Sequence, residues 1–216
     1  QNWSGKDEVS LSLPNATLKA NYLVLAGNAY LGSLGKKLSQ RLMPVGTCMI
    51  ATEPLGSTRA GQLLPCNSAV ADINFVLDYF RLSADQRLLF GGGVSYSTIP
   101  PVNVRSYLKK RMLKVFPSLD DVELEYGWGG LVGITMNRMP NFGRLAPNVF
   151  LAQGFSGHGV ALTGLAGKLM AEVISGTAER FDVMSRVPHL PFPGGTLFRM
   201  PALLLGTTWY RLRDLL

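Results

Sequence analysis

A strand, a glycine-rich turn and a helix follow one another without a gap at residues 148–176. The run NVFLAQ (148–153) is apolar and of strand length, and GFSGHG (154–159) supplies the turn. The next residues repeat apolar side chains at helical spacing, which predicts a helix from about 159 to 175 with Leu162, Leu165, Leu169 and Val173 on its apolar face. Gly176 is a typical residue to end such a helix.

This order of elements suits the binding of an electron-rich group. The first N–H groups of a helix have no partner within the helix, and the helix dipole adds positive charge there. Glycines let a flat ligand touch the backbone. The spacing is G-x-x-G-x-G rather than the dinucleotide pattern G-x-G-x-x-G, so spacing alone leaves a ligand site and a plain tight turn equally open.

A second apolar run, YLVLAG (22–27), has the pattern of a central strand buried on both faces. It ends at Gly27-Asn28, beyond the carboxyl end of the strand, where open α/β sheets bind their ligands. We therefore expect strands 18–26 and 148–153 to be neighbours and Gly27 to lie close to Gly154.

The rest of the chain predicts a second, antiparallel lobe. Residues 43–52 and 122–135 resemble strands, and residues 74–93 resemble a hairpin that turns near Ala84-Asp85-Gln86 and ends in FGGG. Residues 102–119 have a helical pattern that Pro117 ends, and the Pro- and Gly-rich tail after Phe181 predicts an extended segment with a short terminal helix. The fold class is thus mixed, α/β with α+β features, in two lobes.

Composition excludes several classes of protein. The chain has 216 residues, 47% hydrophobic and 16% charged, which is typical of a globular protein. Its net charge of +7 comes without a basic cluster interleaved with aromatic residues, so we expect no nucleic-acid partner. No apolar run is long enough to predict a membrane span, and PALLLGTTWY (201–210) is too short to cross a bilayer, although it could rest on a partner or a membrane surface. Cys48 and Cys66 give no sign of a disulfide, which favours the cytoplasm.

Common catalytic motifs are absent. The three glycines at 91–93 lack the Lys-Ser/Thr of a phosphate loop, and the two Cys and two His lack zinc-ligand spacing. Gly157 follows Ser156 directly and so comes one residue too early for the G-x-S-x-G of a nucleophile elbow. His158 can be a general base or a residue that positions the turn or a cofactor, and the second role is favoured because no carboxylate stands at helical spacing from it. No catalytic residue is assigned.

Four segments together resemble a known family: LVLAGNAYL, FGGGVSYS, WGGLVGITMNRMPNFG and GFSGHGVALTGLAGKLMAEVISG. They look like the C-terminal half of FAD-dependent oxidoreductases of the D-amino-acid oxidase group, which includes glycine and sarcosine oxidases. ATEPL, VFPSLDD and HLPFPGG are similar to the gamma-glutamylputrescine oxidase subgroup. The resemblance extends from about residue 8 to the end of the chain.

The resemblance implies oxidation of an amine, here a gamma-glutamylated polyamine, by hydride transfer to FAD, with an aldehyde, ammonia and hydrogen peroxide as products. It implies a Rossmann-like FAD-binding lobe at 1–40 and 128–180, a substrate lobe at 41–127 and a tail at 181–216. The residues implied to contact the cofactor are Ala26, Gly27, Asn28, Trp128, Gly130, Gly154, Phe155, Ser156, Gly157, His158, Gly159 and Val160.

Departures from the family pattern refine these expectations. Ala161 stands where some relatives keep a lysine for the substrate carboxylate, and no Cys follows Cys66, so FAD should be bound non-covalently. No Lys occurs between Lys37 and Lys109 to assist oxygen, which leaves a dehydrogenase with another electron acceptor open. The chain begins at Gln1 and contains no G-x-G-x-x-G strand–turn–helix, so we expect an N-terminal FAD-binding segment to be missing and this part to be inactive alone.

Two other classes of function remain open from the sequence. The chain could be a non-catalytic binding module that keeps the fold without the flavin, or a basic protein that binds acidic partners. A G-x-G-x-x-G element in a longer parent protein would favour an oxidoreductase over the binding module. Salt-sensitive binding of nucleic acid would support the basic protein that binds acidic partners.

Overall fold

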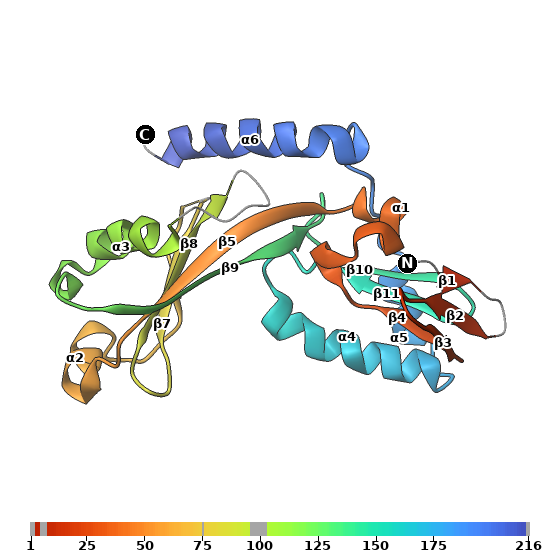
Figure 1. Cartoon of the computed structure of the whole chain (residues 1–216), viewed down its shortest axis with the longest axis horizontal. Helices are drawn as coiled ribbons and strands as arrows, with labels where there is room; N and C mark the ends of the chain where they lie inside the picture. Colours follow the sequence, from red (N-terminus) through yellow and green to blue (C-terminus); the bar gives the residue numbers. More distant parts are fainter. Residues whose placement is uncertain (1–2, 5–7, 75, 96–102, 215–216) are drawn as a thin grey trace. The chain divides into compact units, whose positions relative to one another are not determined.

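The computed structural model of the chain (Figure 1) describes residues 3–4, 8–74, 76–95 and 103–214. Val102, at the start of the helix predicted over 102–119, and the last two residues of FGGGVSYS lie outside these ranges. The chain divides into two compact units, one formed by 1–44 and 132–200 and the other by 45–131 and 201–216. The mixture of helices and largely antiparallel sheets confirms the predicted fold class.

Three elements continue from one unit into the other: β5 (Met43–Thr52), β9 (Leu124–Ile134) and α6 (Gly195–Asp214). The remaining elements of the first unit are β1 (Trp3–Ser4), β2 (Val9–Ser12), β3 (Thr17–Ala20), β4 (Leu23–Leu25), η1 (Asn28–Tyr30), η2 (Gly32–Gly35), α1 (Lys36–Ser39), β10 (Asn141–Ala146), β11 (Val149–Gln153), α4 (Gly159–Ile174) and α5 (Glu179–Ser185). Those of the second unit are α2 (Gly56–Leu63), β6 (Val70–Ala71), β7 (Asp78–Leu82), β8 (Leu88–Ser95), α3 (Val104–Val115) and η3 (Pro117–Leu119).

The first unit is built on a three-stranded sheet in the order β10-β11-β4. β4, which is part of the strand predicted over 18–26, is the parallel neighbour of β11, with Val149 opposite Leu23 and Leu151 opposite Leu25, which confirms the expected pairing. The rest of the prediction was wrong: Thr17–Ala20 form β3 in another sheet, and Val24 is 38% exposed, so the run is not buried on both faces within the described residues. Every residue of β11 is buried, as the continuous apolar run requires. A separate antiparallel sheet, β1-β2-β3, completes the strands of this unit.

Helix α4 packs on the β10–β11 sheet through a shared apolar core. Phe150 and Phe181 are almost fully buried there, with their rings edge to face at 5.6 Å. The buried residues of α4 are Ala166, Leu169, Met170 and Val173, with Leu162 partly buried against them. The prediction was wrong for Leu165, which is 39% exposed, because it points about 90° away from the centre of this buried stripe at 100° per residue.

The second unit is a five-stranded antiparallel sheet in the order β6-β7-β8-β5-β9. It joins the three segments that were predicted to form one lobe, with the hairpin β7–β8 at the predicted turn. Helix α3 covers one face, because its Leu108 and Met112 are fully buried in the same cluster as Ile50 and Phe90. The helix begins after Asn103, whose side chain accepts from the N–H of Ser106, and ends before Pro117, so it is shorter than predicted.

The three glycines of β8 have a structural explanation. A Cβ on Gly91 would lie 2.3 Å from the ring of Tyr79, and one on Gly92 would lie 2.1 Å from Asp78 Oδ1. A Cβ on Gly93 would lie 2.3 Å from the hydroxyl of Tyr107 on α3. Side chains from β7 and α3 therefore cross directly over the glycine backbone, which accounts for all three glycines without a ligand.

The terminal helix is longer than the sequence predicted. The terminal helix α6 has 20 residues, so the prediction of a short helix was wrong: Pro201 lies inside it and does not end it. Neither α6 nor any other helix in the described part of the chain is long and apolar enough to cross a membrane.

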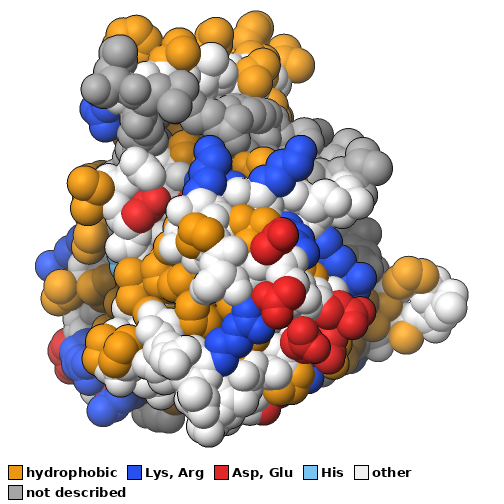
Figure 2. Space-filling view, turned by 90° about the vertical axis from the view of Figure 1, so that its left-hand side faces the viewer, with side chains coloured by type: hydrophobic (Ala, Val, Ile, Leu, Met, Phe, Trp, Pro, Cys, Tyr) orange, Lys and Arg blue, Asp and Glu red, His pale blue; other side chains and the backbone are white. Residues whose placement is uncertain are grey.

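Figure 2 shows Asp and Glu side chains next to Lys and Arg side chains on one face of the molecule. The ion pairs of the second unit include Arg59–Asp121 and Arg87–Glu125. Cys48 is buried and Cys66 exposed, and both are free thiols.

Candidate functional site

The carboxyl ends of β4 and β11 meet in the first unit. Asn28 follows β4 and has a positive φ of 46°, and its side-chain Oδ1 accepts the N–H of Gly154 at 2.9 Å. The same oxygen lies 2.4 Å from the position of a Cβ on Gly133, near the end of β9. Asn28 thus joins three segments that are far apart in sequence, and Gly154 lies close to Gly27 as the sequence predicted.

The turn 154–157 is held by backbone geometry and by one serine. Gly154 has a φ of +73°, and a Cβ there would lie 2.4 Å from Thr135 Cγ2 and 2.9 Å from Leu42 Cδ2. Ser156 is buried with a φ of +52°; its N–H donates to Gly133 O at 3.0 Å, and its hydroxyl accepts the N–H of Thr135 at 3.3 Å. The end of β9 therefore forms a support beneath the turn.

Helix α4 starts without a side-chain cap. His158 occupies the N-cap position, and its side chain makes no capping hydrogen bond. The first helical bond runs from the N–H of Leu162 to His158 O at 3.1 Å, so the N–H groups of Gly159, Val160 and Ala161 have no partner within the helix. Val160 is fully exposed and Ala161 is exposed, which leaves the positive end of the helix dipole accessible to an anionic or electron-rich group.

Phe155 and Ser156 of the turn are buried, whereas Gly157 and His158 are exposed. Phe155 and Ser156 are 8% and 6% exposed, so their side chains support the fold. Gly157 is exposed and has a φ of +96°, and no atom of the described chain lies within 4 Å of the position that a Cβ would take there. His158 is exposed and holds the turn through its backbone, since its N–H donates to Phe155 O at 2.9 Å.

The other residues implied by the resemblance lie in two places. Ala26 and Gly27 are exposed at the end of β4, beside Asn28. Trp128, which is 45% exposed, and Gly130 lie on the part of β9 that belongs to the second unit. Their contact with a cofactor stays a prediction.

Three residues at the turn were missed by sequence reasoning: Leu42, Gly133 and Thr135. Gly133 stood within a segment recognised as glycine-rich, but no spacing relates it to Asn28 or to Ser156. Leu42 directly precedes β5 and Thr135 directly follows β9, and nothing in the sequence marks either residue as part of the site. Only the tertiary contacts identify their roles.

A replacement of Asn28 by Gly tests the bridging role of its side chain. Glycine keeps the positive φ but removes the acceptor of the Gly154 N–H, so we expect the free energy of unfolding to fall by about 1–2 kcal/mol. Urea denaturation measures this loss. Asn28→Asp, which keeps an oxygen at the same place, is the matched control and should lose less; an equal or larger loss in Asn28→Asp would contradict the role of this hydrogen bond.

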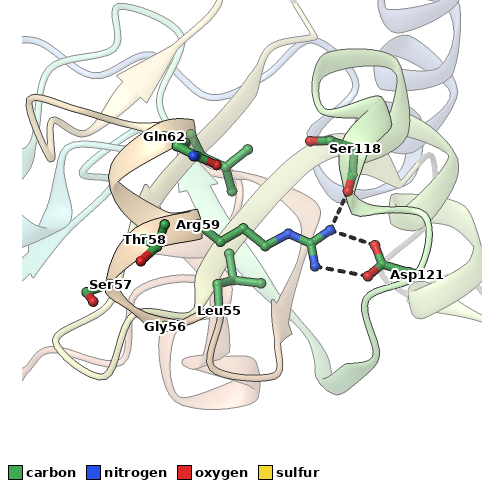
Figure 3. Close-up of a pocket in the computed structure, with 9 residues that line it drawn as sticks. Leu55, Gly56, Ser57, Thr58, Arg59, Gln62, Ser118 and Asp121 are labelled. Carbon is green, nitrogen blue, oxygen red and sulfur yellow. Dashed lines mark hydrogen bonds and ion pairs between the residues drawn. The ribbon is translucent and has the colours of Figure 1, made fainter.

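The second unit contains a cavity of about 750 Å³ between α2 and the residues after α3 (Figure 3). Arg59 lines it and donates to both carboxylate oxygens of Asp121, at 3.0 and 2.6 Å, and to Ser118 O. These bonds hold the pKa of Asp121 below its ordinary value. Because Arg59 already has its anionic partner and none of the residues implied to contact the cofactor lines this cavity, the turn of the first unit remains the candidate site.

The family model described as FAD dependent oxidoreductase matches residues 4–173. The chain belongs to this family. Among curated proteins it is 48% identical over 196 residues to the gamma-glutamylputrescine oxidoreductase of Escherichia coli (strain K12), across 90% of this chain and 46% of that protein. It is 40% identical over 196 residues to a probable oxidoreductase, OrdL, of Haemophilus influenzae, across 89% of this chain and 44% of that protein.

Solved structures of other proteins share the fold. Glycine oxidase from Geobacillus kaustophilus matches with a TM-score of 0.71 at 20% identity, over 88% of this chain and 51% of that one. L-proline dehydrogenase from P. horikoshii matches with a TM-score of 0.63 at 19% identity, over 81% of this chain and 48% of that one. The chain spans about half the length of the curated relatives it matches.

Proposed function

We propose that this chain supplies one side of the FAD site and the substrate lobe of an FAD-dependent amine oxidoreductase. The observation that carries the proposal is the hydrogen bond between the N–H of Gly154 and the side chain of Asn28. It brings the end of β4 and the uncapped start of α4 together, at the carboxyl edge of a parallel strand pair, in a chain of the FAD dependent oxidoreductase family.

The turn and the helix start fit an electron-rich ring. Gly157 leaves open space above the backbone, and the free N–H groups of Gly159, Val160 and Ala161 would stabilise negative charge on a ring bound there. Asn28 and Ser156 would keep these amides in place. Binding would be non-covalent, because no Cys occurs after Cys66.

The substrate we propose is a gamma-glutamylated polyamine such as gamma-glutamylputrescine. The 48% identity to gamma-glutamylputrescine oxidoreductase supports this choice, and Ala161, exposed in the first turn of α4, offers no charge for an amino-acid carboxylate. When bound, FAD would supply the redox chemistry by taking a hydride from the amine, so that hydrolysis of the imine gives an aldehyde and ammonia and reoxidation by oxygen gives hydrogen peroxide. The two free thiols suit the cytoplasm.

We further propose that a segment outside this sequence completes the cofactor site. Within the described residues β4 is the last strand of its sheet, so one edge of it is available for a further parallel strand. Gly164 and Gly167 on α4 have no atom of the described chain within 4 Å of a Cβ position, so this face of the helix can accept a close neighbour. A G-x-G-x-x-G strand and helix would fit both features and bind the pyrophosphate.

Replacement of Gly164 by Ala tests this part of the proposal. In the 216-residue chain, alanine meets nothing and improves helix propensity, so the free energy of unfolding should rise by about 1 kcal/mol. In the longer parent protein, a helix packed against Gly164 would turn this gain into a loss. Thermal or urea denaturation of both proteins measures the difference; the same gain in both would show that nothing packs there.

The ligand at the turn is tested with two glycines at opposite ends of α4. Gly157 and Gly176 both have a φ of +96° and open space around a Cβ position, so alanine at either should cost the same stability, about 1–2 kcal/mol. Only Gly157→Ala should weaken FAD binding in the parent protein, measured by fluorescence titration of the apoprotein. Equal FAD affinity in the two variants would sink the proposed site.

Turnover of the parent protein with gamma-glutamylputrescine tests the reaction. A peroxide assay detects an oxidase, and reduction of an artificial dye without peroxide detects a dehydrogenase, which the absence of Lys between Lys37 and Lys109 favours as the second candidate. Absence of both signals with an FAD-loaded protein would leave a non-catalytic binding module. A flavin absorbance band that copurifies with the 216-residue chain alone would contradict the need for a further segment.

A further inference from the structure

Residues 188–199, the strap from here on, fasten the segment that leads from α1 into β5. Three hydrogen bonds from the strap end on its backbone oxygens: Phe192 N–H to Gln40 O at 2.8 Å, and Arg199 Nη1 to Ser39 O and, at 3.0 Å, to Leu42 O. Arg199 lies in the part of α6 that belongs to the first unit, beside the end of α1 (Figure 1). One guanidinium therefore closes the loop between α1 and β5.

Leu42 connects this loop to the turn at Gly154. Its side chain is 3% exposed, and its Cδ2 lies 2.9 Å from the position that a Cβ on Gly154 would take. By binding the carbonyl oxygen of Leu42, Arg199 fixes where this side chain stands under the turn. The turn leads directly to the free N–H groups at the start of α4, so a shift of Leu42 would reach them through contacts that are already packed.

The strap also reaches the second support of the turn. Thr135 lies on the other side of the Gly154 Cβ position, and its hydroxyl donates to Met139 O at 2.8 Å. Between these two residues, Asn137 Nδ2 donates to Pro188 O at the start of the strap, also at 2.8 Å. The strap is thus bonded to both segments that hold the turn.

Stability alone does not explain an arginine at position 199. Arg199 is half-buried, and its Nε is buried without a hydrogen-bond partner among the described residues. Burial lowers the pKa of the guanidinium, and no carboxylate of the described chain is close enough to offset this effect. An apolar side chain of similar length would fill the space at a lower cost in desolvation. What only a charged donor supplies is the pair of bonds to Ser39 O and Leu42 O.

We propose that Arg199 is a positioning residue for the cofactor turn. It fixes Leu42, Leu42 holds Gly154, and the turn keeps the N–H groups at the start of α4 in the orientation that binds the flavin. This inference rests on the proposed function and adds to it a residue that acts on the flavin through the fold.

Arg199→Met in the longer parent protein tests the proposal, because methionine keeps an apolar stem and removes the donors. FAD affinity, measured by fluorescence titration of the apoprotein, should fall about threefold to tenfold. The midpoint potential of the bound flavin should become more negative, since the reduced, anionic flavin depends most on the N–H groups. Arg199→Lys, which keeps a charge and donors, should recover part of both values.

Asn148→Ala is the matched control in the same unit. Asn148 is buried and donates to Asn21 O, but it lies at the end of β11 that is remote from the turn. Its loss should lower stability and leave FAD affinity and potential unchanged. Hydrogen exchange of the apoprotein adds a readout without FAD: the amides of 154–160 should exchange about tenfold faster in Arg199→Met and at the unaltered rate in Asn148→Ala.

A double variant tests the route through Leu42. In a Leu42→Ala background, Arg199→Met should change FAD affinity little, because the contact that transmits its effect is already lost. Additive losses in the double variant overturn the proposal. So does an unchanged affinity, potential or exchange rate in Arg199→Met, or the same changes in Asn148→Ala.

Gly157→Ala separates this inference from the proposed function. If Gly157→Ala weakens FAD binding and Arg199→Met does not, only the role of Arg199 is wrong. If neither variant alters FAD binding, the cofactor site at the turn is wrong, and the positioning role is overturned with it.

Discussion

Gly154→Ala should destabilise the first unit by about 3 kcal/mol in urea denaturation. Its φ of +73° costs an alanine about 1–2 kcal/mol, and the new Cβ would lie 2.4 Å from Thr135 Cγ2 and 2.9 Å from Leu42 Cδ2. Neither neighbour can retreat easily: Thr135 is 1% exposed and bonded through its hydroxyl to Met139 O, and Leu42 is 3% exposed. Steric overlap therefore adds to the backbone strain.

Gly157→Ala is the control for Gly154→Ala, because it carries a similar backbone strain and meets no atom of the described chain. The difference in unfolding free energy between the two variants isolates the steric part, about 1–2 kcal/mol. If both variants were equally stable, the support of the turn by Leu42 and Thr135 would be wrong. The comparison also separates a glycine that the fold requires from one that a ligand requires, since only the second should alter FAD affinity more than stability.

Asp78→Ala should cost the second unit about 2–3 kcal/mol. Asp78 on β7 accepts from Arg111 Nε at 2.7 Å, and the two side chains are only 14% and 24% exposed. Removal of the carboxylate leaves the Arg111 guanidinium partly buried without its anion, although its Nη2 still donates to Val76 O at 3.3 Å. The loss would loosen the contact between α3 and β7.

The exposed pair Arg59–Asp121 is the matched comparison for Asp78. It is also an Arg–Asp pair within the same unit, between α2 and the turn after η3, but its side chains are 33% and 71% exposed. Water screens this pair, so Asp121→Ala should cost clearly less stability than Asp78→Ala. Equal losses for Asp78→Ala and Asp121→Ala, measured by urea denaturation, would show that burial does not decide the strength of these ion pairs.

Apolar periodicity predicted the main strands and the helix after the glycine turn, because both patterns follow directly from which side chains are buried. The two apolar runs at 22–27 and 148–153 also indicated that their strands are neighbours, and the structure adds that they are parallel. The support of the turn could not be predicted in this way. Gly133 and Thr135 contact the turn through packing between distant segments, and Leu165 was misplaced because an apolar residue at the edge of a helical stripe can face either way.

The oxygen of Asn28 also constrains how related sequences can differ. Position 28 needs a residue that tolerates a positive φ and offers an acceptor to Gly154, and this acceptor occupies the space of a side chain at position 133. Positions 28 and 133 therefore form a coupled pair. A side chain larger than glycine at 133 would have to displace the Asn28 side chain from Gly154, or occur together with a residue at 28 whose side chain leaves this space empty.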